Sequence, residues 1–131
     1  MRKYKCQYRH CQHPEDLMLK EDAVLIGTKR MHKDCAEIRN TIERAKRIFF
    51  DHIKADVDYV QTVGVLNNLV FKKGYSADYV EFALMWLALR GAKVNSPYSL
   101  HLVMQNNLIS RDYKNPSTRQ DVVNRYAYRF G

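Results

Sequence analysis

Apolar and polar positions along the chain change their period near residue 34, and this change divides the sequence. Residues 1–15 are polar and show no period, which predicts a loop or knuckle. Residues 16–28 hold two short apolar runs on either side of a charged segment at 20–22, which predicts a short hairpin. From Asp34 onward apolar residues recur every three or four positions, the period of an amphipathic helix.

The helical part begins with a long helix followed by a break. The segment Asp56-Val57-Asp58 ends this helix and can cap a second one, which is predicted over 59–73 and stopped by Gly74. The apolar face of the first helix is formed by Ile38, Ile42, Ala45, Phe49 and Ile53.

Three further helices are predicted after Gly74. The third is apolar almost all round, begins at an N-cap Ser76 and ends at Gly91, so it is expected to be the central helix. Ser96-Pro97 starts a fourth, which reaches about Asn106 and continues irregularly to 110. Residues 111–115 are predicted to be a loop, and the capping box at 117–120 opens the last helix.

These elements predict a mostly helical α+β protein in two parts. Residues 1–35 form a small zinc-binding module, and residues 36–131 form a domain of four to five helices, with the first helix shared between the two. The length of 131 residues and the 46% hydrophobic content suit one globular domain with a small satellite module. The longest apolar run, residues 82–89, is too short to span a bilayer, and residues 1–20 show no signal peptide.

Cysteine and histidine are concentrated before the helical part. All three cysteines fall within the first 35 residues, so they are not a disulfide framework, and a cytoplasmic location is expected. Together with one histidine they form C-x4-C, twenty intervening residues, then H-x2-C, with Cys6, Cys11, His32 and Cys35 as the candidate metal ligands.

This spacing predicts a structural zinc ion, for which three thiolates and one imidazole are a standard ligand set. A tight turn can direct Cys6 and Cys11 at one ion. His32 and Cys35 share a face if they begin a helix, and a helix N-terminus favours the thiolate. His10 and His13 flank Cys11, and either remains open as a replacement for His32 as ligand.

A knuckle, a hairpin and a helix that supplies the last two ligands resemble a treble-clef zinc finger. The H-x2-C half is similar to the first zinc half of LIM-type fingers, whereas C-x4-C departs from the usual C-x2-C. The resemblance covers residues 4–50 only. It implies a zinc ion bound by the four candidate ligands more than it implies a function, because such fingers bind nucleic-acid and protein partners alike.

Basic residues surround both ligand pairs. The chain carries a formal net charge of +8, with the excess in residues 1–50 and 101–131, while residues 51–100 are neutral. Such an excess favours a polyanionic partner, and nucleic acid, either DNA or RNA, is the preferred one. Tyr4 and Tyr8 are candidates for stacking on bases. The candidate nucleic-acid-binding residues are Arg2, Lys3, Lys5, Arg9, Lys29, Arg30 and Lys33, with Arg125 and Arg129 on the last helix.

The preferred hypothesis is a non-catalytic zinc-binding protein that binds nucleic acid, in the manner of a small phage-type regulator. No enzyme motif such as GxGxxG, HExxH or GxSxG is present, so no catalytic activity is expected. An alternative is a protein-interaction module or an inhibitor of a host enzyme, such as an anti-defence protein. A third is a small metal-dependent nuclease built on Asp51, His52, Asp56 and Asp58.

Overall fold

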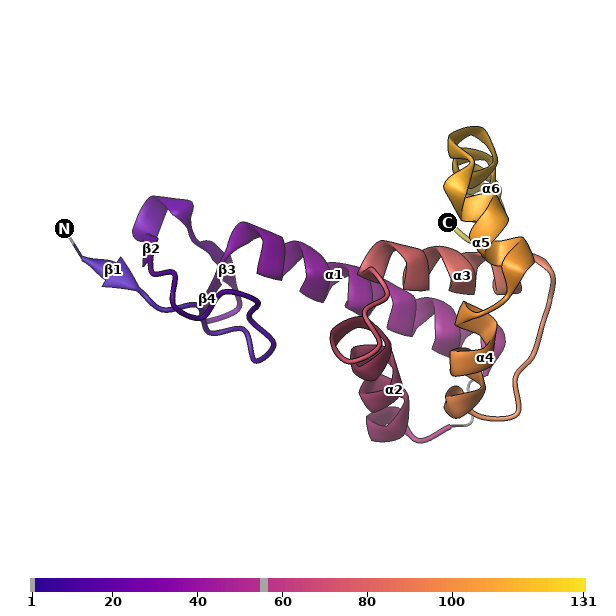
Figure 1. The fold of residues 1–131 in the computed structure, drawn as a ribbon, viewed down its shortest axis with the longest axis horizontal. Helices are drawn as coiled ribbons and strands as arrows, with labels where there is room; N and C mark the ends of the chain where they lie inside the picture. The colour runs from indigo at the N-terminus through magenta and orange to yellow at the C-terminus, as the bar shows by residue number, and fades with distance from the viewer. Residues whose placement is uncertain (1, 55–56) are drawn as a thin grey trace. The chain divides into compact units, whose positions relative to one another are not determined.

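The computed structural model describes residues 2–54 and 57–131. The described residues are mostly helical, with six α-helices and two small antiparallel sheets of two strands each. The chain forms two compact units, residues 1–41 (unit 1) and residues 42–131 (unit 2). The boundary between them lies within helix α1 (Lys33–Ile48), which begins in unit 1 and ends in unit 2 (Figure 1).

Unit 1 contains both sheets. Strand β1 (Lys3–Tyr4) pairs with β2 (Met18–Leu19), and β3 (Val24–Ile26) pairs with β4 (Lys29–Met31). A 3-10 turn, η1 (Lys20–Asp22), connects the two sheets. The core of this unit consists of the buried residues Cys6, Met18, Met31, Cys35 and Ala36, with Tyr8, Cys11, Ala23, Val24 and Ile26 packed against them.

The hairpin predicted within residues 16–28 is wrong in its pairing. The two apolar runs do not pair with each other, because the first pairs with β1 and the second with β4. The charged segment between them winds into the 3-10 turn instead of reversing the chain. The reversal occurs at Gly27, whose φ of 61° is accessible to glycine at little steric cost.

Unit 2 contains the end of α1 and five further helices. They are α2 (Tyr59–Phe71), α3 (Ala77–Leu89), α4 (Leu100–Met104), α5 (Asn107–Lys114) and α6 (Pro116–Phe130). A π-helical turn, η2 (Phe49–Ile53), extends α1, and a 3-10 turn, η3 (Pro97–Ser99), precedes α4. Asp58 and Ser76 cap α2 and α3, since their side chains accept the N–H groups of Gln61 and Tyr79 at 2.8 and 3.1 Å.

The prediction was wrong at the C-terminal side of unit 2. Residues 111–115 are not a loop, because α5 continues to Lys114. Its N-cap Asn106 accepts the N–H of Leu108 at 2.8 Å. The last helix begins at Pro116 rather than at a capping box, since Asn115 accepts the N–H of Ser117 at 3.1 Å. An asparagine cap followed by proline is a competing start signal two residues upstream of the predicted one.

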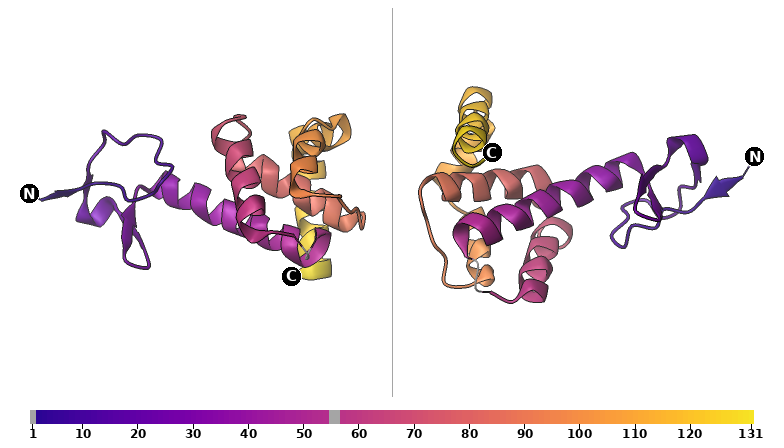
Figure 2. Two further views of the ribbon diagram at one scale, coloured as in Figure 1. Left: turned by 90° about the horizontal axis from the view of Figure 1, so that it is seen from below. Right: turned by 180° about the vertical axis from the view of Figure 1, so that it is seen from behind.

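The centre of unit 2 is α3. Figures 1 and 2 show α2 and α4 on one side of α3 and α6 on the other, and the buried face of α3 includes Val80, Ala83 and Leu84. Trp86 connects α3 to α5, because its indole N–H donates to the carboxylate of Asp112 at 2.9 Å. Among the described residues, every helix is too short or too polar to span a bilayer.

Truncation of a buried side chain on α3 is expected to destabilise unit 2. Leu84 is 0% exposed, so Leu84→Ala should lower the free energy of unfolding by about 2–5 kcal/mol. Leu102→Ala is the matched control, because Leu102 is 73% exposed and its loss should change stability by less than about 0.5 kcal/mol. Urea denaturation followed by the fluorescence of Trp86, the single tryptophan, measures both. Equal effects of the two substitutions would contradict the central position of α3.

Candidate metal centre

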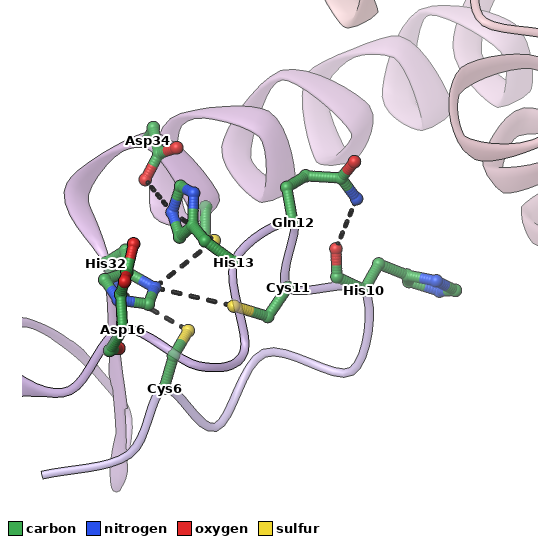
Figure 3. Close-up of polar contacts among 9 residues, drawn as sticks. Cys6, His10, Cys11, Gln12, His13, Asp16, His32 and Asp34 are labelled. Atoms are coloured by element: carbon green, nitrogen blue, oxygen red, sulfur yellow. Dashed lines mark hydrogen bonds and ion pairs between the residues drawn. The ribbon is translucent and has the colours of Figure 1, made fainter.

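Four residues of unit 1 bring their donor atoms to one point. The thiol sulfurs of Cys6, Cys11 and Cys35 and a ring nitrogen of His32 all lie within 4.8 Å of one another. Figure 3 shows the side chains of Cys6, Cys11 and His32 directed toward one another. The three cysteines are free thiols, so no disulfide competes for the sulfurs. The structure therefore contains a Cys3His cluster that is compatible with a metal ion in a zinc-finger-like site.

Backbone contacts position each ligand. Cys6 follows β1, and its sulfur accepts the N–H of His32 at 3.4 Å. A tight turn directs Cys11 back toward Cys6, since the N–H of Cys11 donates to the carbonyl of Tyr8 at 3.1 Å. His32 directly precedes α1, and its carbonyl accepts the N–H of Ala36 at 2.9 Å, which places Cys35 in the first turn of that helix.

Two of the distances between donor atoms are compatible with a tetrahedral metal site. Bond lengths of about 2.3 Å for Zn–S and 2.0 Å for Zn–N place a sulfur and a nitrogen about 3.5 Å apart in a tetrahedron. Nδ1 of His32 lies 3.5 Å from the sulfur of Cys11 and 3.8 Å from that of Cys35. Both distances exceed those of ordinary polar hydrogen bonds and fit two ligands of one ion.

His32 is oriented for coordination through Nδ1. Its other ring nitrogen, Nε2, lies 2.8 Å from the backbone carbonyl of Asp16, an arrangement in which Nε2–H donates to the carbonyl (Figure 3). Such a bond fixes the tautomer that leaves the lone pair on Nδ1, the atom that faces the sulfurs. This contact was not found from the sequence, because a backbone carbonyl has no residue-type signal.

The thiols lie in a poorly solvated environment. Cys35 is 0% exposed, and burial raises the pKa of its thiol to about 12, with further contributions from Cys11 and Cys6. At Cys6 burial also acts to raise the pKa, but hydrogen bonds from the N–H groups of His32 and Tyr8 outweigh it and lower the pKa. Three neighbouring thiolates repel one another, so a cation is the natural stabiliser of the fully ionised cluster.

The two alternative histidines differ in position. The ring of His10 points away from the sulfurs in Figure 3, and His10 belongs to neither donor group found among the described residues. His13 belongs to a second group, with His32, Asp34 and Cys35. Its Nε2 lies 3.0 Å from the carboxylate of Asp34 and 3.9 Å from the sulfur of Cys35, so its alternative role as ligand is geometrically open.

The two groups of basic residues in unit 1 meet at Tyr4. The guanidinium groups of Arg2 and Arg30 lie 5.2 and 4.3 Å from the centre of its ring. Gln7 connects the same segments, because its N–H donates to the carbonyl of Arg30 and its side-chain oxygen accepts the N–H of Arg30, both at 2.8 Å. Tyr8 is half-buried and packs against the core of unit 1. The remaining cations are exposed, namely Lys3, Lys5, Arg9, Lys29 and Lys33.

The other candidate residues lie in unit 2. Arg125 forms an ion pair with Asp121 at 2.9 Å, and Arg129 donates to the carbonyl of Leu89 at 3.0 Å. The residues proposed for a nuclease do not form a donor group in the part of the chain that the structure describes. The ring of His52 packs against Phe130, Asp58 caps α2, and Asp56 lies outside the described residues.

No protein-family model, curated protein or solved structure matches this chain. The donor atoms of the cluster, their distances and their burial indicate its chemistry. These show a possible metal site of three thiols and one imidazole in a mostly helical chain.

Substitution of each histidine should identify the nitrogen ligand. With Co²⁺ as a spectroscopic probe, His32→Ala is expected to change the visible absorption bands, because the metal loses a ligand. It should weaken Co²⁺ binding by more than the roughly 10- to 100-fold that is typical when only a hydrogen-bond partner of a ligand is lost. His10→Ala is the control and should leave the spectrum unchanged. If His13→Ala alone changes the spectrum, then His13 and not His32 is the ligand.

Proposed function

We propose that the chain is a non-catalytic zinc-binding protein that binds nucleic acid, with a treble-clef-type module in unit 1. The observation that carries the proposal is the Cys3His cluster, whose four donor atoms lie within 4.8 Å of one another. The order of elements around it supports the treble-clef type. A knuckle holds Cys6 and Cys11, the β3–β4 hairpin follows, and α1 supplies Cys35 in its first turn.

The donor set favours zinc in a structural role. Thiolate and imidazole are ligands of zinc rather than of magnesium or calcium, which prefer oxygen. Catalytic zinc sites keep one coordination position for water, whereas four protein ligands fill a tetrahedron. The proposed ion therefore has no open position for a substrate, which supports a structural function.

Unit 1 is so small that a bound ion would contribute much of its stability. A unit of about 40 residues rarely buries enough apolar surface to fold without a disulfide, a metal or a partner. Its core contains five buried residues, and two of them, Cys6 and Cys35, are proposed ligands. A zinc ion would cross-link β1, the knuckle and α1 at the centre of this core, so metal binding and folding of unit 1 would be one process.

Loss of one thiolate should destabilise unit 1 but not unit 2. We expect Cys35→Ser to lose most of the bound zinc and to unfold unit 1, because the remaining ligands no longer close the tetrahedron. Unit 2 should stay folded, so the fluorescence of Trp86 should change little. Metal content by mass spectrometry and amide hydrogen exchange of residues 2–41 provide the measurements. Zinc retained by the variant would remove Cys35 from the ligand set.

The cations around the cluster support nucleic acid as the partner. Arg2 and Arg30 share the Tyr4 ring, and further lysines and arginines of the same segments are exposed. Because unit 1 is small, these charges lie close together although they come from two parts of the sequence. Release of counterions from phosphates would supply much of the binding free energy.

Charge reversal at two exposed lysines should weaken this binding. Lys29→Glu with Lys33→Glu is expected to reduce both the affinity for nucleic acid and the salt dependence of binding. The log–log slope should fall by about 0.7–0.9 for each phosphate that the variant no longer neutralises. The matched control is Lys72→Glu with Lys73→Glu, which makes the same charge change at exposed positions of unit 2. Fluorescence anisotropy at several salt concentrations measures both variants. If both double variants weaken binding equally, then the affinity depends on the net charge of the chain and not on the position of the lysines.

A further inference from the structure

A groove on unit 2 gathers three arginines around one exposed aromatic ring. It is lined by the end of α3, by α5 and by α6, and its lining includes Arg90, Arg125, Arg129 and Tyr128. The packing of α3 against α6 adds Arg90 to the two arginines that the sequence indicated. We propose that this groove binds single-stranded nucleic acid, with the arginines on backbone phosphates and Tyr128 stacked on a base.

The structure holds the arginines in defined orientations. The guanidinium of Arg90 lies 3.4 Å from the centre of the Trp86 ring, and Nη1 of Arg129 donates to the carbonyl of Leu89 at 3.0 Å. A guanidinium carries five N–H donors, so one such bond leaves several for a ligand. Its planar fork matches the oxygens of a phosphate, and a side chain that is already oriented loses less entropy on binding.

Tyr128 supplies the feature that favours nucleic acid over an acidic peptide. Its side chain is 96% exposed, although an aromatic ring on a surface helix usually packs against its neighbours. It lies three residues after Arg125 and directly before Arg129 on α6, so the ring and the Arg125 guanidinium occupy neighbouring positions of the helix and both line the groove. A single strand also alternates phosphates and bases, and its unpaired bases can stack on a tyrosine.

Two carboxylates also line the groove, and an anionic ligand would compete with them for the arginines. Asp112 is engaged by the indole N–H of Trp86 at 2.9 Å and by Arg111 at 3.3 Å. Asp121 forms the 2.9 Å ion pair with Arg125, whose side chain is 72% exposed. A phosphate on Arg125 would displace Asp121 from it and would be repelled by that carboxylate. Removal of the charge of Asp121 should therefore strengthen binding.

This inference takes its partner class from the proposed nucleic-acid function, but it is independent of zinc because every residue of the groove belongs to unit 2. Experiments can therefore contradict the proposal for the groove without contradicting the proposal for the basic surface of unit 1, and the reverse. Substitutions in one unit leave the charges of the other unit unchanged.

The test measures binding of fluorescein-labelled twelve-nucleotide oligothymidylate and oligouridylate to the full zinc-loaded chain. Tyr128→Ala should weaken binding about tenfold, whereas Tyr128→Phe, which keeps the ring, should bind like the wild type. Asp121→Asn should bind several-fold more tightly. Arg125→Gln should lower the salt slope by about 0.7, the contribution of one phosphate on a single strand. Because Tyr128 is exposed, its substitution should not alter the unfolding midpoint reported by Trp86.

Three results would overturn the inference. If Tyr128→Ala and Asp121→Asn both bind like the wild type while Lys29→Glu with Lys33→Glu abolishes binding, the groove is not the site and the function proposed for unit 1 stands. If polyglutamate competes as well as the oligonucleotide, the groove recognises an acidic protein segment instead. If the wild type binds neither oligonucleotide nor duplex DNA, both nucleic-acid proposals fail.

Discussion

The convergence of three sulfurs and one imidazole nitrogen is the constraint on which unit 1 depends. Around this point the chain has only a few buried apolar side chains, and the strands of its two sheets are two or three residues long. Such short pairings contribute little stability by themselves. A bound ion would join segments that are distant in sequence, Cys6 and Cys11 from one end of the unit and His32 and Cys35 from the other.

Unit 2 is stabilised in a different way. Its central helix α3 is buried along most of its length, and the surrounding helices each cover part of it. The polar contacts at its end, from Trp86 to Asp112 and from Arg129 to the carbonyl of Leu89, connect α3 to α5 and α6. The second contact orients Arg129, and the ring of Trp86 lies against the guanidinium of Arg90. Two arginines of the proposed binding surface are therefore positioned by the C-terminal end of α3.

The chemistry of both proposed sites depends on whether their charged groups are buried or exposed to solvent. In unit 1 burial disfavours the ionised form of the Cys35 thiol, an effect that a divalent cation would reverse. In unit 2 the cations remain near the surface, where they keep donors for an anionic ligand. The chain therefore separates a closed site that suits a structural ion from an open groove that suits a polyanion.

The sequence by itself determined the first three helices from period and caps, with Asp58, Ser76 and Gly91 at the expected ends. It also indicated the four residues of the Cys3His cluster, because ligand type and spacing are local properties. Strand pairing, the carbonyl of Asp16 behind His32, and the position of Arg90 beside α6 were decided only by the tertiary structure. The physical reason is that such contacts join segments far apart in the chain, and short strands, carbonyls and single arginines have no period from which their partners could be predicted.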